Sequence, residues 1–496
     1  MPDGDGLSYR SRTGRWVIAA SVLGSGMASI DATVVGIALP TIGRDFHATV
    51  AQLQWVVNGY TLAVAALLLV GGSLGDRFGR RRLFVIGTAW FTLASAACAV
   101  APGAPALIVL RVLQGVGGAL LTPGSLAILQ SSFREADRGQ AIGAWTGLGG
   151  VASAVGPFLG GWLIAVASWR WIFVINLPVG LAVLLLAVRH VPESKDPSAP
   201  ARVDVTGAVL VAVALAGVTY GLTEGPAHGW HGPGPAVSLA VGAVAAVAFV
   251  VVESRRPAPL LPLGLFRHRQ FAVTNAVTFV VYGALGGVLF LLPVVLQVVG
   301  HYSPLASGVA LLPLTVVMLL LSATSGRVAA RIGPRLQMGV GPVVVGCGLA
   351  LLSRIGPDSA YVSGVLPAVL VFGLGLAVTV APLTATALSS APEEHAGLAS
   401  AVNNDVARIG GLVAVAVLPA LSGISGSAYL HPAALADGFR TATLIGGAWC
   451  VVGGVLAAIG IRNPPRPVPS PDAPARDAPV PLHHCGLDAP PPVTAR

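Results

Sequence analysis

Fourteen apolar runs divide this chain, and their length constrains its fold more than any other feature. Each extends for roughly 18 to 25 residues, which is enough for a helix to cross the ~30 Å hydrocarbon core of a bilayer. Only 10% of the 496 residues are charged, whereas about a quarter of a soluble domain is charged. The sequence therefore predicts an all-α membrane protein with 14 transmembrane helices, beginning near Trp16, Gln54, Leu83, Ala106, Ala141, Trp171, Val205, Pro235, Ala272, Leu305, Met338, Val362, Leu398 and Thr441.

The basic residues lie almost entirely on one side of these spans. Of the 29 Lys and Arg residues, 23 fall on that side, four on the other side and two inside spans. Because Lys and Arg accumulate on the cytoplasmic side of membrane proteins, we expect both termini to be cytoplasmic and the number of spans to be even. The net charge of +9 then faces the inner leaflet of the cell membrane rather than nucleic acid. Lys is nearly absent while Arg, Ala and Gly abound, which is typical of a GC-rich bacterium.

The pattern of cysteines and histidines predicts no metal or cofactor site. Cys98, Cys347 and Cys450 lie inside apolar runs without disulfide or metal-ligand spacing. The alternative is metal binding by His483-His484-Cys485, in a tail whose Pro-, Ala- and Asp-rich composition predicts disorder.

Two charged residues occupy the middle of apolar runs, where insertion scales assign a charge a cost of about 2.5 to 3.5 kcal/mol. They are Asp31 in the first span and Arg111 in the fourth. At the helical rise per residue, each lies roughly 22 Å from the cytoplasmic edge. The two side chains are therefore expected to be level in the membrane.

A short loop segment occurs twice in the chain. Gly72-Ser-Leu-Gly-Asp76-Arg-Phe-Gly-Arg80-Arg-Arg82 is echoed by Gly326-Arg-Val-Ala-Ala330-Arg-Ile-Gly-Pro-Arg335, which indicates two related halves. Ala330 replaces Asp76 in the second copy, so that any function of this carboxylate belongs to the first half alone.

Five motifs, in order along the chain, together resemble the major facilitator superfamily. The segment from Gly72 to Arg82 is similar to its loop signature, Arg111-Val-Leu-Gln114-Gly115 to its buried-arginine motif, and Gly156-Pro157-Phe-Leu-Gly160-Gly161 to its antiporter motif. Ser29-Ile-Asp31-Ala-Thr33-Val-Val-Gly-Ile-Ala-Leu-Pro40 and Trp169-Arg-Trp-Ile-Phe173-Val-Ile-Asn176-Leu-Pro178 resemble the fourteen-span drug:H⁺ antiporter branch. The resemblance covers most of the chain. It implies two six-helix bundles around a central cavity, two additional helices inserted between them, and alternating access.

The predicted spans and this resemblance together divide the chain into five parts. These are a cytoplasmic N-terminus (1–15), an N-terminal six-helix bundle (16–189), a linker with the two additional helices (190–270), a C-terminal six-helix bundle (271–461) and a disordered cytoplasmic tail (462–496).

The resemblance places the first and fourth spans in one bundle, so we expect a direct or water-bridged contact between Asp31 and Arg111. Movement of Arg111, of water or of a bound drug would change the proton affinity of this carboxylate. Asp31 is therefore the candidate site for the coupling proton or a cationic substrate. The alternative is a static ion pair that only stabilises the bundle.

A second pair of charges lies three residues apart in the thirteenth span, at Asp405 and Arg408, and so shares one helix face. In one interpretation Arg408 only neutralises Asp405. In the other, Asp405 faces the cavity and contributes to a second proton or substrate site. The polar neighbours Asn403 and Asn404 favour the second interpretation.

The resemblance implies a gating role for the loop between the second and third spans. Asp76 is then expected near the positive N-terminal end of the thirteenth span, at Ala396 to Leu398, and the loop arginines near Glu135 or Asp137. The residues assigned to this gate are Gly72, Asp76, Arg77, Gly79 and Arg80.

Gly156 and Pro157 interrupt the fifth span, and Gly160 and Gly161 allow another helix to approach closely. These four residues predict a kinked face that seals one bundle against the other, which the resemblance links to exchange rather than symport. Residues that could line a substrate cavity are Gln114, Tyr60, Trp145, Asn403 and Asn404.

These motifs favour a multidrug or antibiotic efflux transporter that is driven by the proton motive force, acts as a monomer and takes an amphipathic or cationic drug. H⁺ is the only coupling ion expected. A proton-coupled importer of a nutrient or siderophore on the same fold is the alternative, followed by a membrane enzyme, for which no catalytic constellation is present. An ATP-driven exporter is excluded because a P-loop requires Gly-Lys-Ser/Thr, and the single lysine, Lys195, follows Ser194 in a polar loop.

Overall fold

The computed structural model describes residues 6–197, 204–230, 232–256, 259–357, 359–390, 396–427 and 430–463. Within these residues, 14 helical segments are long and apolar enough to cross a membrane, which confirms the predicted spans. From residue 464 on, the predicted tail, with its His483-His484-Cys485 segment, lies outside the described residues. The elements are α1 (Arg12–Phe46), α2 (Val50–Phe78), α3 (Arg80–Ala99), α4 (Ala104–Ser132), α5 (Glu135–Val166), α6 (Trp171–Val174), α7 (Asn176–His190), α8 (Val205–His228), α9 (Pro233–Arg255), η1 (Leu263–Arg267), α10 (Arg269–Val298), α11 (Pro304–Ala310), α12 (Leu312–Ile332), α13 (Pro334–Leu352), η2 (Tyr361–Val365), α14 (Leu366–Ser389), α15 (Ala396–Leu421) and α16 (Pro432–Gly460).

Three of the spans are interrupted near one end. The sixth span divides into α6 and α7, the tenth into α11 and α12, and the twelfth begins with the π-helical turn η2 before α14. A proline follows each break within the next turn, at Pro178, Pro313 and Pro367. Proline lacks an amide N–H and disfavours helical geometry in the residue before it, so each helix restarts there.

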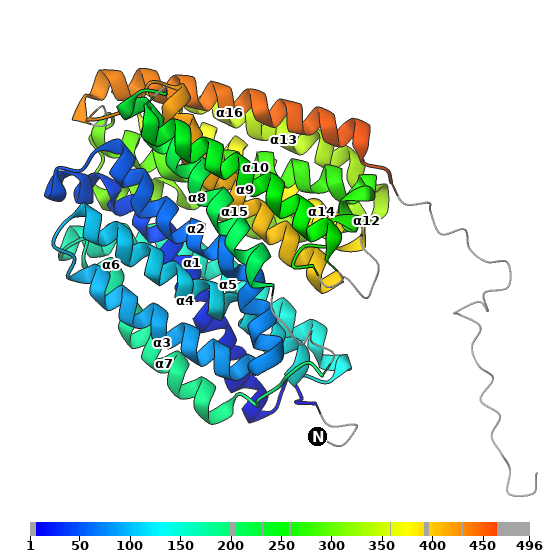
Figure 1. The fold of residues 1–496 in the computed structure, drawn as a ribbon. Helices are drawn as coiled ribbons and strands as arrows, with labels where there is room; N and C mark the ends of the chain where they lie inside the picture. The colour runs from blue at the N-terminus through cyan, green and yellow to red at the C-terminus, as the bar shows by residue number, and fades with distance from the viewer. Residues whose placement is uncertain are drawn as a thin grey trace, which may run out of the picture. The chain divides into compact units, whose positions relative to one another are not determined.

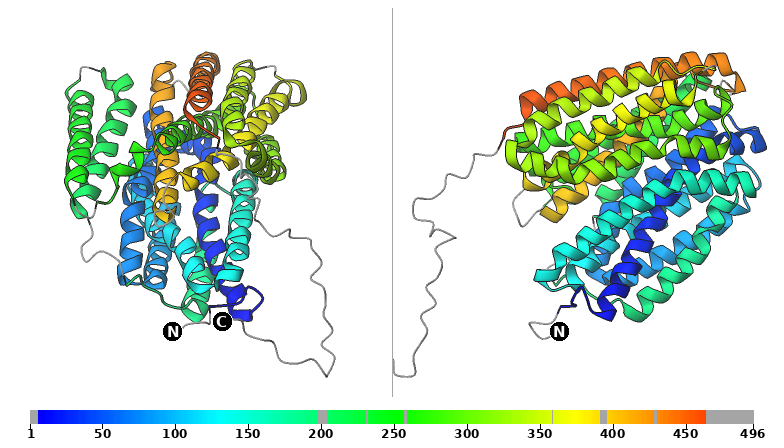
Figure 2. Two further views of the ribbon diagram at one scale, coloured as in Figure 1. Left: turned by 90° about the vertical axis from the view of Figure 1, so that its right-hand side faces the viewer. Right: turned by 180° about the vertical axis from the view of Figure 1, so that it is seen from behind.

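The transmembrane helices form two bundles and a separate hairpin. α1 to α7 pack on one another, and so do α10 to α16, while α8 and α9 pack mainly on each other. Figure 1 shows the two sets of helices by colour, blue to cyan for the first bundle and green to orange for the second. In Figure 2 the hairpin of α8 and α9 stands at one side as a green pair, and α8 touches both α2 and α15. This is the major facilitator fold with two inserted helices.

The two bundles are joined at one end of the helices. We call the end that carries the Arg80–Arg82 cluster the basic end, and the opposite one the far end. At the far end, Gln54 Nε2 of α2 donates to Val415 O of α15 at 2.6 Å. Gln297 Nε2 of α10 donates to Ile37 O of α1 at 2.9 Å.

Towards the basic end, the bundles separate along α5. Gly161, near the far end of α5, is in tight contact with the backbone of α11. Gly150, Gly143 and Gly139 follow at helical spacing on the same face of α5, yet no atom lies within 4 Å of a Cβ built at any of them. The face of α5 that meets the second bundle at the far end therefore meets open space towards the basic end.

Candidate functional site

The centre of the first bundle holds a buried ion pair between Asp31 of α1 and Arg111 of α4. Arg111 Nη1 lies 2.5 Å from Asp31 Oδ2, and both residues are 1% exposed. The structure thus shows the contact that the depth of the two residues predicts. Because both charges are removed from water, the pair depends on hydrogen bonds from its surroundings for stability.

Three further polar side chains complete this network. Gln114 Nε2 of α4 and Asn176 Nδ2 of α7 donate to Asp31 Oδ1, at 2.8 and 3.0 Å. Asn176 Nδ2 also donates to Ser95 Oγ of α3 at 2.9 Å, and Ser95 donates to Phe173 O at 3.0 Å. The network therefore joins α1, α3, α4 and α7. The sequence reasoning did not assign roles to Asn176 and Ser95, although polar residues inside spans are a signal for such a site.

Arg111 has partners other than Asp31. Its Nε donates to Val56 O of α2 at 3.1 Å, and its Nη1 donates to Gln114 Oε1 at 2.7 Å. The guanidinium also lies over the ring of Tyr60, 4.4 Å from the centroid, a distance at which the ring face attracts a cation. Arg111 would therefore keep hydrogen bonds if Asp31 moved away.

Two predicted cavity residues are buried inside their bundles. Tyr60 is 3% exposed and covers Arg111. Asn403 of α15 donates through Nδ2 to Asn275 Oδ1 and Thr278 Oγ1 of α10, at 3.1 and 2.8 Å. In this conformation Tyr60 and Asn403 contact partners within their own bundles and do not line an open cavity, and their place in a substrate cavity stays a prediction.

Other predicted cavity residues lie closer to open space. Asn404 is exposed on α15 and its Nδ2 donates to Ser400 O at 3.0 Å. Trp145 is half-buried on α5 and its Nε1 donates to Ser25 Oγ of α1 at 2.9 Å. Gln114 belongs to the Asp31 network instead.

Asp405 of α15 is buried and has an unpartnered oxygen. The residue is 6% exposed, and its Oδ1 has no hydrogen-bond partner among the described residues. Arg408, three residues along, forms no ion pair with it in the described part of the chain. Arg408 lies close enough to both Asp405 and Tyr60 to act on them electrostatically. Three charged residues of the prediction, Asp31, Arg111 and Arg408, thus lie around Tyr60.

The four residues of the predicted antiporter motif lie between helices, as the motif implies. A Cβ at Gly156 would lie 2.0 Å from Thr33 Oγ1 of α1, and one at Gly161 would lie 2.5 Å from Pro304 O of α11. Gly160 packs on Val34 of α1, and Pro157 O lies against Gly308 of α11. This face of α5 therefore packs on its own bundle and on the second one.

The loop between α2 and α3 forms local contacts at the basic end. Arg80 Nη2 lies 2.8 Å from Asp76 Oδ1, and the guanidinium of Arg77 lies over the ring of Phe78. A Cβ built at Gly72 would have one neighbour within 4 Å, the Cβ of Pro123 at 3.8 Å. No described contact joins this loop to α15, whose neighbouring residues 391–395 lie outside the described part.

In this conformation no described ion pair joins the loop arginines to Glu135 or Asp137, and their approach stays a prediction for the outward-facing state. Asp137 pairs with Arg134 at 2.5 Å, because that arginine is closer on the same helix. Glu193 takes the predicted place: its carboxylate accepts from the backbone N–H groups of Arg81 and Arg82 at 3.0 and 3.2 Å. A carboxylate is stabilised at this position by the positive end of α3.

Gly79 is the residue that makes this arrangement possible. Its φ is +121°, and a Cβ there would lie 2.7 Å from the Glu193 carboxylate. We expect Gly79→Ala to destabilise the protein by about 1 to 3 kcal/mol, the cost of holding a strained backbone conformation. Thermal unfolding of the purified protein measures this change. Gly72→Ala is the control, since its Cβ has room; an equal loss in both variants would contradict the role of φ at Gly79.

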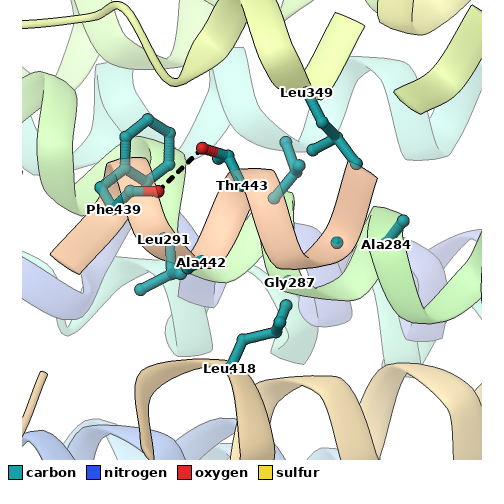
Figure 3. A pocket seen from close by; sticks show the side chains of 10 residues that line it. Ala284, Gly287, Leu291, Leu349, Leu418, Phe439, Ala442 and Thr443 are labelled. Carbon is teal, nitrogen blue, oxygen red and sulfur yellow. Dashed lines mark hydrogen bonds between the residues drawn. The ribbon is translucent and has the colours of Figure 1, made fainter. Parts of the chain in front are cut away.

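The second bundle contains a small apolar cavity. Figure 3 shows a small cavity between α10, α13, α15 and α16, with a volume of about 10 Å³. Its single polar side chain, Thr443, donates to Phe439 O at 2.8 Å. Apolar walls and a volume near that of one water molecule mark a packing defect rather than a substrate site. Among the described residues, no three His, Cys, Asp or Glu side chains are grouped to hold a metal ion.

Comparison with protein families and known sequences places this geometry in context. The family model described as Major Facilitator Superfamily matches residues 21–415. The tetracenomycin C resistance and export protein of Streptomyces glaucescens is 38% identical over 405 residues, which cover 82% of this chain and 75% of that protein. The methylenomycin A resistance protein of Bacillus subtilis is 36% identical, covering 84% and 90%. The puromycin resistance protein of Streptomyces alboniger is also 36% identical, covering 85% and 86%.

Solved structures share the fold at low sequence identity. A bacterial homologue of the human lysosomal transporter Spinster, in an inward-facing and unoccupied conformation, superposes with a TM-score of 0.64 at 15% identity and covers 91% of this chain and 97% of its own. A D-xylose–proton symporter gives a TM-score of 0.62 at 16% identity, with coverage of 90% and 98%. At such identities the similarity establishes the fold and not the substrate.

Proposed function

The chain belongs to the Major Facilitator Superfamily, and from this premise we propose that it exports an antibiotic or another drug in exchange for protons. Three of its relatives are resistance proteins for tetracenomycin C, methylenomycin A and puromycin. These relatives support a small amphipathic organic substrate. They also favour export over the uptake of a nutrient on the same fold.

The orientation in the membrane follows from the arginine clusters. The basic end carries Arg80–Arg82, Arg134 and Arg189, and positively charged loops remain in the cytoplasm. We therefore place the basic end and both termini in the cytoplasm of a bacterial cell, and the far end outside. The joined far end and the open face of α5 at the basic end then correspond to an inward-facing state that is ready to accept a drug from the cytoplasm.

The observation that carries this proposal is the buried Asp31–Arg111 pair with its ring of donors. Arg111, Gln114 and Asn176 all donate to the Asp31 carboxylate. The three donors leave one lone-pair position free on Oδ2, and a proton bound there would remove the negative charge that holds Arg111, so protonation weakens the ion pair. Proton binding is thereby linked to the relative positions of α1, α4 and α7.

Arg111 can tolerate this change because it retains other partners. When Asp31 is protonated, Val56 O, Gln114 Oε1 and the Tyr60 ring still hold the guanidinium. Because Arg111 has these other partners, the ion pair between Asp31 and Arg111 can break and form again in each transport cycle. A guanidinium whose single partner was one carboxylate would be left buried and unpaired, at a cost of several kcal/mol. We assign Asp31 as the site of the coupling proton and Arg111 as the residue that responds to it.

Asp405 is proposed as a second charge that acts on cationic substrates. Its carboxylate is buried, forms no ion pair with any residue that the structure describes, and belongs to the helix that meets α2. We expect Asp405→Ala to reduce export of a cationic dye about tenfold, equivalent to about 1.4 kcal/mol, and to leave an uncharged drug unaffected. Export assays in inverted vesicles measure both. Asp437→Ala, which removes an exposed carboxylate of the second bundle, is the control, and unchanged export of every substrate by Asp405→Ala would favour simple neutralisation by Arg408.

The proposed function is tested by expression in a drug-sensitive bacterium that lacks its own pumps. We expect growth on several antibiotics or dyes to improve, the cells to accumulate less drug, and a protonophore to abolish both effects. Accumulation of a compound above the control level would instead identify an importer. The protein is further proposed to work as a monomer, with no cofactor, no nucleic-acid partner and no enzymatic activity, and a catalytic turnover of the drug in vesicles would contradict the last point.

A further inference from the structure

The inserted hairpin carries two buried carboxyl groups at its basic end. Asp204 precedes α8 and is 7% exposed, and Glu253 lies in the last turn of α9 and is 2% exposed. They are far apart in the sequence, and the hairpin brings them within hydrogen-bonding reach of one another. Neither residue belongs to the Asp31 network or to a motif of the sequence analysis.

One oxygen of each carboxyl group has a partner. Asp204 Oδ1 accepts from Gly207 N at 2.7 Å, as an N-cap does, and pairs with Arg256. Glu253 Oε2 accepts from Leu261 N at 2.8 Å. These bonds hold the two groups in place.

The other two oxygens face the same space without a partner. Asp204 Oδ2 and Glu253 Oε1 are both buried and have no hydrogen-bond donor among the described residues. A Cβ at Gly207 would lie 3.0 and 2.5 Å from them, so this glycine leaves the space in which they meet. Two oxygens that can only accept cannot share a hydrogen bond unless one of them carries a proton.

The charges around Asp204 and Glu253 are balanced when the two carboxyl groups share one proton. Arg256 neutralises a single carboxylate. Arg255 precedes Arg256 at the end of α9 and is exposed. The element η1 packs against α9, and its Arg267 and the following His268 are exposed as well. Arg202 lies outside the described residues. With one shared proton, the group of Asp204, Glu253 and Arg256 has no net charge, whereas two adjacent buried carboxylates would repel each other.

We propose that Asp204 and Glu253 form a second proton-binding site, separate from the one in the first bundle, in which one proton joins the two carboxyl groups. The described residues do not build a metal site here, because no third His, Cys, Asp or Glu side chain among them is grouped with the two carboxyl groups. As the pH at the basic end rises, the shared proton is lost and the two carboxylates repel each other.

This site connects the hairpin to the second bundle. Leu261, the residue whose N–H binds Glu253, packs with a small apolar cluster of Leu265, Phe271, Ala399 and Val402. Ala399 and Val402 belong to the half of α15 that precedes Asp405. The proton therefore stabilises the segment that links α9 to α10 and to α15, so that the hairpin responds to pH at the basic end.

Infrared difference spectroscopy of the purified full-length protein tests this site without a transport assay, so its result is independent of the proposed function. We expect the C=O stretching band of a protonated carboxylic acid at neutral pH, lost on alkaline titration. Glu253→Gln should remove this band, because Arg256 neutralises the remaining Asp204 carboxylate. Asp204→Asn should shift the band, because the buried Glu253 then holds its proton without a neighbouring carboxylate.

Glu224→Gln is the matched control, since it changes a carboxylate at the other end of α8 that accepts from Trp55 Nε1 at 3.1 Å. It should leave the band intact. Retention of the full band at an unchanged frequency in both Asp204→Asn and Glu253→Gln, or its removal by Na⁺ or Mg²⁺ at constant pH, would overturn the proposal. Both variants preserve side-chain size, and thermal unfolding identifies one that fails to fold, in which case the other decides.

Discussion

Asp31→Asn is expected to reduce proton-driven drug export in inverted vesicles to the level seen with a protonophore. The amide preserves the size of the side chain, but it cannot take up and release a proton, and its NH2 group cannot accept the hydrogen bonds that one carboxylate oxygen accepts. It also leaves the buried Arg111 guanidinium without its counter-charge, and because Val56 O, Gln114 Oε1 and the Tyr60 ring compensate in part, we expect a loss of stability below the ~3 to 5 kcal/mol of a fully unpaired buried charge. Asp45→Asn is the matched control, because this carboxylate of the same helix is at the far end, pairs with Arg170 at 3.0 Å and is partly exposed.

The double variant Asp31→Asn/Arg111→Gln separates a proton site from a static ion pair. Removing both charges eliminates the unpaired guanidinium, so thermal stability should return towards that of the wild type. If Asp31 binds the coupling proton, export remains absent although stability is regained. If the pair only stabilises the bundle, export returns together with stability, and the assignment of Asp31 is wrong.

Gly161→Val is expected to have the second-largest effect. A Cβ at this position would lie 2.5 Å from Pro304 O and 2.7 Å from Leu305 Cα, and these are backbone atoms of the other bundle that cannot rotate away. The substitution should push α5 away from α11 and open the contact at the far end. We expect drug export to fall at least tenfold, equivalent to about 1.4 kcal/mol or more, and a cysteine introduced at the far end to become accessible to a membrane-impermeant thiol reagent.

Gly147→Val is the control for this substitution. It adds the same side chain to the same helix, where no atom lies within 4 Å of the Cβ position. Drug export by this variant should remain within about twofold of export by the wild type, because substitutions at positions without contacts usually cost less than about 0.5 kcal/mol. Equal losses in Gly147→Val and Gly161→Val would show that bulk on α5, rather than the seal with α11, is responsible.

The amino-acid sequence by itself determined the number of transmembrane helices and the existence of a buried charge pair. A span requires a long apolar run, and an apolar run is visible one residue at a time. Asp31 and Arg111 were predicted to be level because both positions follow from counting residues along single helices. The antiporter motif was recognisable for a similar reason, since small residues at helical spacing lie on one face.

Only the tertiary structure decided which side chains meet. Asn176 and Ser95 complete the Asp31 network, Glu193 takes the place predicted for Glu135 or Asp137, and Asn403 and Tyr60 are buried within their own bundles. Each of these contacts joins helices that are distant in the sequence, and their relative rotation is set by packing across the whole bundle. The meeting of Asp204 and Glu253 has the same origin, because it depends on how α8 and α9 close on each other.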